Sequence, residues 1–146
     1  MKKNGFTLTE ILIVSSIITF IIGFSSFFYQ RFSKSDFVID ESASLVISIL
    51  NLARQKAIVS EENDNWGVWF INAPTQDYFF LFKGNTSTLR DKYLLPHEVS
   101  FFDFTEKIIV FQKLSGDTNA TTIKIGFNPN FFKTIKVSTS GVITIE

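Results

Sequence analysis

One stretch near the N-terminus constrains the possible folds of this chain most strongly. Residues 6–29 are apolar or weakly polar except for Glu10, and no charged residue occurs from Ile11 to Gln30. A helix of about 20 apolar residues spans the ~30 Å hydrocarbon core of a bilayer. We therefore expect residues 6–30 to form the transmembrane half of an N-terminal helix and to contact lipid.

The position of Glu10 separates three interpretations of this segment. A secretory signal peptide carries its charges ahead of the apolar region and ends in small residues, whereas here a carboxylate lies inside the apolar run. A plain single-pass anchor for an extracytoplasmic binding domain stays an alternative, because an acidic residue close to the end of a membrane helix costs less than one at its centre. The third interpretation depends on the complete N-terminal sequence.

Residues 2–14, KKNGFTLTEILIV, resemble the prepilin signature of type IV pilins and type II secretion pseudopilins. The resemblance implies that a prepilin peptidase cuts between Gly5 and Phe6, removes residues 1–5 as a leader peptide and methylates the new amine of Phe6. It also implies that the carboxylate of Glu10 pairs with this ammonium group on a neighbouring subunit. A hydrogen-bonded charge pair is far less costly in apolar surroundings than an unpaired charge. A contact within one helix, between positions i and i+4, is the alternative.

Three segments of the second half resemble the H-class minor pseudopilins and their FimT-like relatives. They are LARQKA at 52–57, LPHEVSF at 95–101 and KTIKVSTSGV at 133–142. Relatives often have glycine where this chain has Glu98 and arginine where it has Val142. The resemblance implies a minor subunit of a type IV pilus or type II secretion filament.

The same resemblance implies partners and a location. The partners are other pilin or pseudopilin subunits, the prepilin peptidase and an inner-membrane assembly platform. The chain would cross the bacterial inner membrane once, with its globular domain periplasmic or extracellular, and then enter a filament. Lys2 and Lys3 favour a cytoplasmic N-terminus, although Arg31 and Lys34 on the far side oppose this.

Residues 31–62 are expected to form the amphipathic half of the helix and to belong to the globular domain. Leu45, Ile49 and Leu52 recur at spacings of four and three, which indicates one apolar helix face. Polar side chains follow another side of the same helix: Asp40, Ser44, Ser48, Asn51 and Gln55. The acidic and amide residues 61–65 favour a loop and are expected to end the helix.

Residues 63–146 form short β-rich runs separated by polar turns and are expected to complete the globular domain. We expect strands at 66–71, 77–83, 98–104, 107–113, 121–127, 132–138 and 142–145. Strands that follow one another without intervening helices pair antiparallel. The predicted fold class is therefore α+β, a long N-terminal helix packed on an antiparallel β-sheet. The run Tyr78-Phe79-Phe80 places aromatic side chains on both faces of a strand.

Composition excludes several classes of site. The chain has no cysteine and a single histidine, so thiolate metal sites, cysteine nucleophiles and histidine clusters are excluded. His97 is expected to lie in a loop. We expect no catalytic residues, metal or cofactor, and we do not classify the chain as an enzyme. Nucleic acid is not an expected partner, because the 14 basic and 14 acidic residues balance and Lys124, Lys133 and Lys136 are scattered.

Overall fold

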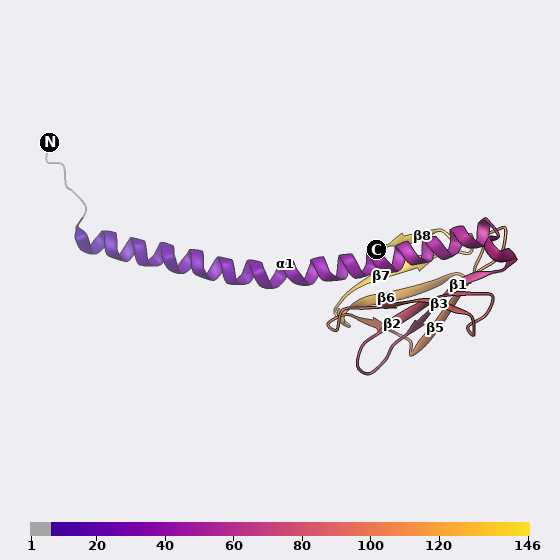
Figure 1. The fold of residues 1–146 in the computed structure, drawn as a ribbon. Helices are drawn as coiled ribbons and strands as arrows, with labels where there is room; N and C mark the ends of the chain where they lie inside the picture. Colours follow the sequence, from indigo (N-terminus) through magenta and orange to yellow (C-terminus); the bar gives the residue numbers. More distant parts are fainter. Residues whose placement is uncertain (1–6) are drawn as a thin grey trace. The chain divides into compact units, whose positions relative to one another are not determined.

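A computed structural model of the 146-residue chain describes the backbone of residues 7–146 and the side chains of residues 7–25 and 37–146. The chain divides into two compact units between Asp36 and Phe37. One helix, α1 (Leu8–Ile58), contributes to both units (Figure 1).

The N-terminal unit contains the apolar part of α1. Residues Leu8–Ser25 have a mean hydropathy of 2.0, and none of them is buried within the protein. By length and composition this segment can cross a membrane. Ser15, Ser16 and Thr19 donate their hydroxyl hydrogens to backbone carbonyls three or four residues earlier. These hydroxyls are therefore satisfied inside the helix, as an apolar environment requires.

The second unit packs the rest of α1 with two four-stranded antiparallel sheets. The first sheet has the order β3-β2-β1-β5 and the second β4-β6-β7-β8. After the short 3₁₀ helix η1 (Glu61–Asn63), the strands are β1 (Trp66–Ile71), β2 (Tyr78–Lys83), β3 (Leu89–Leu94), β4 (Ser100–Phe102), β5 (Glu106–Phe111), β6 (Thr121–Asn128), β7 (Phe131–Val137) and β8 (Ile143–Ile145). The predicted fold class is confirmed, with two sheets where the sequence indicated one.

Strand β3 was not among the expected strands. Its sequence, LRDKYL, carries three charged residues, and every position except Tyr93 is exposed. It lies at the edge of the first sheet, where it pairs only with β2. An edge strand with so little burial lacks the apolar alternation by which strands are recognised in a sequence.

The buried face of α1 follows the spacing of a helix. Ala43, Val46, Leu50, Ala53 and Ala57 are each fully buried, at intervals of three and four residues. The predicted apolar face is confirmed, but two of the residues that indicated it, Leu45 and Leu52, are only partly buried at its margin. The predicted polar side is solvent-exposed except for Asn51, which is half-buried.

Aromatic rings join the two sheets. Phe101 of β4 packs edge-on against Phe70 of β1, with ring centroids 5.3 Å apart, and lies 6.3 Å from Phe79 of β2. Phe70 and Phe79 stack at 5.5 Å. All three rings are fully buried, and burial of a ring of this size contributes roughly 2–3 kcal/mol.

The helix ends slightly before the acidic and amide cluster. Its last residue is Ile58, and Ser60 adopts the left-handed conformation with φ 55° and ψ 38°. The amide of Leu114, from the loop after β5, donates to the carbonyl of Ala57 at 2.9 Å. One of the carbonyls left open at the helix C-terminus is thus satisfied by another part of the unit.

Candidate functional site

Glu10 lies in the first turn of α1, where it forms a reciprocal cap with Thr7. The amide and hydroxyl of Thr7 both donate to Oε2 of Glu10 at 2.9 Å, and the amide of Glu10 donates to Oγ1 of Thr7 at 3.3 Å. Because Thr7 precedes the first helical residue and Glu10 is the third, this is a capping box. Two backbone amides that have no partner within the helix are satisfied in this way.

The sequence interpretation of Glu10 did not include Thr7, although the Thr-x-x-Glu pattern at a helix start was the signal for it. Gly5 and Phe6, the predicted cleavage and methylation residues, lie outside the described residues. The cap orients the Glu10 carboxylate toward the N-terminal end of the helix. That end also carries the positive pole of the helix dipole, which stabilises a carboxylate.

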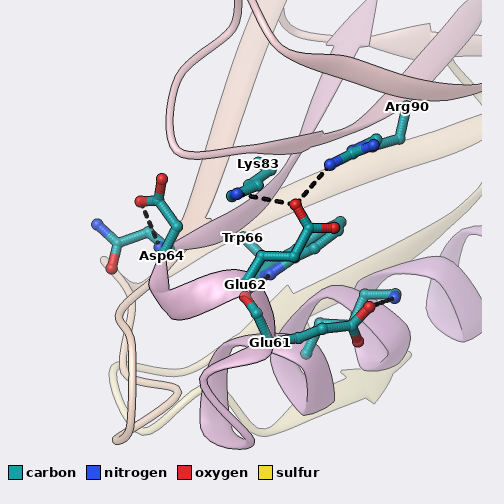
Figure 2. Close-up of polar contacts among 8 residues, drawn as sticks. Glu61, Glu62, Asp64, Trp66, Lys83 and Arg90 are labelled. Carbon is teal, nitrogen blue, oxygen red and sulfur yellow. Dashed lines mark hydrogen bonds and ion pairs between the residues drawn. The ribbon is translucent and has the colours of Figure 1, made fainter.

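A second group of polar side chains lies where α1 passes into β1 (Figure 2). Oε2 of Glu62 accepts hydrogen bonds from Nζ of Lys83 at 2.8 Å and from Nη2 of Arg90 at 2.6 Å. The hydrogen bond from Lys83 lowers the pKa of Glu62, and the nearby charge of Arg90 adds to this effect. Glu62 thereby links the turn after the helix to the end of β2 and to the edge strand β3.

Glu61 and Trp66 hold the other side of this turn. Lys56 of α1 donates to Oε1 of Glu61 at 2.6 Å, and its ammonium group lies 4.6 Å from the centre of the Trp66 ring. The indole N–H of Trp66 donates to the carbonyl of Glu61 at 3.0 Å (Figure 2). These contacts surround a shallow hollow in which Lys56 pairs with Glu61 and Arg90 pairs with Glu62. The carboxylate of Asp91 also lines this hollow.

The first sheet carries aromatic side chains on both faces, as the run Tyr78-Phe79-Phe80 predicted. Phe79 points into the core, whereas Tyr78 and Phe80 are half-buried on the opposite face, beside Trp69. The ammonium group of Lys92 lies 4.1 Å from the centre of the Tyr78 ring. The rings on this face are tilted or perpendicular to one another.

The remaining candidate residues do not converge on a site. His97 is exposed in the loop between β3 and β4, as predicted. Within residues 7–25 and 37–146, no three histidine, aspartate or glutamate side chains gather closely enough to hold a metal ion. Burial raises the pKa of the Tyr93 hydroxyl, and the charge of Asp91 raises it further.

The N-terminal segment and the fold each resemble known proteins. Residues 1–26 match the sequence family described as the prokaryotic N-terminal methylation motif. The fold is similar to the crystal structure of the type IV minor pilin FimU from Pseudomonas aeruginosa (strain PAO1), with a TM-score of 0.56. The aligned region covers 73% of this chain and 91% of that chain at 13% sequence identity. This chain therefore joins a prokaryotic N-terminal methylation motif to a fold similar to that of a type IV minor pilin. Curated protein sequences give no match.

The motif and the pilin-like fold account for the arrangement of the chain. The methylation motif covers the predicted leader, Glu10 and most of the membrane segment. The long N-terminal helix and the antiparallel strands match the pilin fold. Motif and fold together indicate a structural subunit. The more specific resemblance to the H class stays a prediction.

Proposed function

We propose that this pilin-like chain is a minor subunit of a type IV pilus or a type II secretion filament. Prepilin peptidase cuts it between Gly5 and Phe6 and methylates Phe6, and the mature subunit enters the filament through its N-terminal helix. The observation that carries this proposal is the occurrence of the methylation motif and a pilin-like fold in a single chain. Neither the motif nor the fold would be as specific alone.

Cleavage changes the charge beside Glu10. In the precursor, the nitrogen of Phe6 is an uncharged amide, whereas cleavage turns it into an ammonium group. The capping hydrogen bonds from Thr7 hold the Glu10 carboxylate at the same end of the helix. A carboxylate and an ammonium group brought together in apolar surroundings are much less costly than either alone. We propose that the Glu10 carboxylate pairs with the Phe6 ammonium of a neighbouring subunit and sets the axial position of the two helices.

The proposed location follows from the membrane segment and its flanks. Residues 6–30 span the inner membrane, and Lys2 and Lys3 keep the precursor's N-terminus in the cytoplasm, where the peptidase and the assembly platform act. The globular unit is then periplasmic before assembly. Two features support the minor rank: the resemblance of residues 95–101 and 133–142 to minor pseudopilins, and the similarity of the fold to a minor pilin.

The deciding experiment is intact mass analysis of the chain after co-expression with an active prepilin peptidase. We expect a chain that begins at Phe6 and carries one added methyl group. Gly5→Val should block cleavage, because it places a side chain beside the scissile bond, while Asn4→Ser should be processed normally. A chain that still begins at Met1 in membranes containing active peptidase would contradict the proposal.

A further inference from the structure

Two short segments of the globular unit carry the acceptor sequence for asparagine-linked glycosylation, Asn-X-Ser/Thr with X other than proline. Residues 85–87, Asn-Thr-Ser, lie between β2 and β3, and residues 119–121, Asn-Ala-Thr, lead from the loop after β5 into β6. So short a pattern arises easily by chance. The local structure therefore has to decide which segment can serve as an acceptor.

The side chain of Asn119 is free to react. Asn119 and Ala120 are both exposed and belong to no helix or strand. Within the part of the chain that the structure describes, no residue forms a hydrogen bond with the Asn119 side chain. The fold therefore places no restraint on its amide nitrogen, Nδ2, to which a glycan is attached.

The backbone is fixed on both sides of Asn119 but not at Asn119 itself. The carbonyl of Asp117 accepts a backbone amide at 2.8 Å, and the amide of Thr118 donates to a backbone carbonyl at 2.9 Å. Thr121 is the first residue of β6. Between these anchors, no backbone hydrogen bond joins Asn119 or Ala120 to the other described residues. An enzyme can therefore draw Asn119 away from the surface at little cost in local unfolding.

The other acceptor sequence is held in a closed turn. Oδ1 of Asn85 accepts the backbone N–H of Ser87 at 3.1 Å and also the hydroxyl of Ser87. The amide of Thr88 donates to the carbonyl of Asn85 at 3.1 Å, and the amide of Lys83 donates to the carbonyl of Thr88 at 3.2 Å. Removal of Asn85 from this turn would break these hydrogen bonds, so residues 85–87 are the poorer acceptor.

An acidic residue further distinguishes the two segments. The exposed Asp117 lies two residues before Asn119, and within the described ranges no cation pairs with its carboxylate. The corresponding position before Asn85 is occupied by Lys83, which pairs with Glu62 at 2.8 Å. A free carboxylate at a fixed distance from the acceptor is a group that an arginine of an enzyme can bind. Residues 117–121, Asp-Thr-Asn-Ala-Thr, thus place a carboxylate, an amide and a hydroxyl at alternate positions.

We propose that Asn119 is an acceptor for an N-linked glycan. The donor is an oligosaccharide linked to a polyprenyl diphosphate. Nδ2 of Asn119 forms a bond to the anomeric carbon of the first sugar, and the bond between this carbon and the phosphate oxygen breaks. Polyprenyl diphosphate leaves, and the proton lost by Nδ2 is released to the solvent. This inference rests on the periplasmic location of the globular unit in the proposed function.

The experiment expresses the full chain in bacteria whose periplasm contains a bacterial oligosaccharyltransferase and a polyprenyl-diphosphate-linked oligosaccharide of known mass. Active prepilin peptidase is present in the same cells. Intact mass analysis then reports the glycan and the N-terminus together. We expect the mass of a single oligosaccharide on a chain that begins at Phe6. Asn119→Gln should abolish this added mass, and the matched variant Asn85→Gln should retain it.

Two further substitutions test how the acceptor is recognised. Thr121→Ser should retain the glycan, whereas Thr121→Val, which keeps the branched shape in β6 but lacks the hydroxyl, should lose it. Asp117→Ala should lower the modified fraction severalfold while thermal unfolding of the globular unit stays unchanged. Retention of the glycan in Thr121→Val would contradict recognition of this acceptor sequence.

A second copy of residues 117–121, appended after Glu146 through a glycine–serine linker, is the internal reference. If the appended copy is modified and Asn119 is not, the fold withholds Asn119 and the inference is overturned, while the periplasmic location stands. If neither copy is modified in cells that glycosylate a periplasmic control protein, the inference and the proposed location are both overturned. A glycosylated chain that still begins at Met1 would support the inference and contradict the proposed cleavage.

Discussion

The carboxylate of Asp77 joins the two sheets of the globular unit. Its Oδ2 accepts the backbone N–H of Phe101 at 2.6 Å, and its Oδ1 accepts the backbone N–H of Ala73 at 2.9 Å. Asp77 directly precedes β2 in the first sheet, and Phe101 is the central residue of β4 in the second. Asp77 is only 2% exposed, so water cannot replace either hydrogen bond without rearrangement.

A fragment of residues 35–146 is expected to be soluble, folded and monomeric. Every residue of the fully buried core cluster lies between Ala43 and Val137, so the fragment retains that core without the apolar part of α1. The measurements are circular dichroism, which should show cooperative thermal unfolding, and sedimentation. Non-cooperative unfolding would show that the globular unit depends on residues 1–34.

Asp77→Ala should lower the free energy of unfolding of this fragment by about 3 kcal/mol, because it leaves the buried amide of Phe101 and the part-buried amide of Ala73 without acceptors. Urea unfolding at neutral pH measures this difference. The matched control is Asp117→Ala in the exposed loop after β5, where we expect a change within about 0.5 kcal/mol. Equal effects of the two substitutions would contradict a linking role for Asp77.

The ion pairs of Glu62 predict a pH dependence of stability. The pKa of its carboxyl is lowered in the folded chain from the ordinary value of 4.5, chiefly by the hydrogen bond from Lys83. The contribution of Glu62 is therefore present above the unfolded pKa and is lost as the pH falls through the folded pKa. Glu62→Gln should be less stable than the unmodified chain at pH 6, and the difference should shrink below about pH 4.5.

Thermal unfolding at a series of pH values measures this effect. Glu98→Gln, in the exposed loop before β4, is the control and should follow the unmodified chain at every pH. A difference between Glu62→Gln and the unmodified chain that stays constant from pH 6 to pH 3 would exclude the carboxylate charge as its cause.

Ser60→Gly should stabilise the globular unit. Ser60 follows the end of α1 with φ 55°, a conformation that glycine adopts without the penalty that a Cβ imposes. We expect a gain of about 0.5–1 kcal/mol in the free energy of unfolding. The same substitution at Ser48, on the exposed side of α1, should instead cost about 0.5 kcal/mol. Destabilisation by both substitutions would show that the Ser60 side chain contributes more than its backbone conformation costs.

Glu10→Ala should leave membrane insertion and peptidase cleavage largely intact while impairing incorporation into filaments. Removal of the carboxylate lowers the cost of insertion but leaves the partner's ammonium group without a counter-charge in the assembled filament. Quantification of the subunit in membranes and in sheared filaments separates the two steps. Thr7→Ala, which removes the side-chain part of the cap but keeps the carboxylate, is the matched control and should assemble more efficiently than Glu10→Ala.

The sequence predicted best those strands that carry buried apolar side chains. The strand at 66–71 was predicted with both ends correct, and the strands at 78–83, 121–128 and 131–137 to within one residue at each end, because each combines buried apolar positions with many β-branched and aromatic residues. The sequence did not predict β3, because that strand is exposed at nearly every position. The division of the strands into two sheets could not be predicted from the sequence. β1 pairs with β5, about forty residues away along the chain, and no local sequence pattern encodes such a pairing.

The candidate site was predictable only in part. Glu10 stands out in the sequence because a charge in an apolar run is costly, whereas its cap with Thr7 depends on the helix beginning at Leu8. The links from Glu62 to Lys83 and Arg90 cross more than twenty residues of sequence. They depend on a turn with left-handed residues at Ser60, Glu62 and Asn63, and none of these is a glycine that would have marked it.

The exposed edge strand β3 has a consequence for how the protein can diverge. Apart from Tyr93, which stacks on Phe79, and Arg90, which pairs with Glu62, its side chains contribute little to the fold, and its backbone hydrogen bonds to β2 tolerate most side chains. Substitutions there cost little stability as long as they keep the edge charged enough to prevent pairing with other chains. Among the described strands, β3 is therefore the one whose surface can change most freely through substitution while the fold persists.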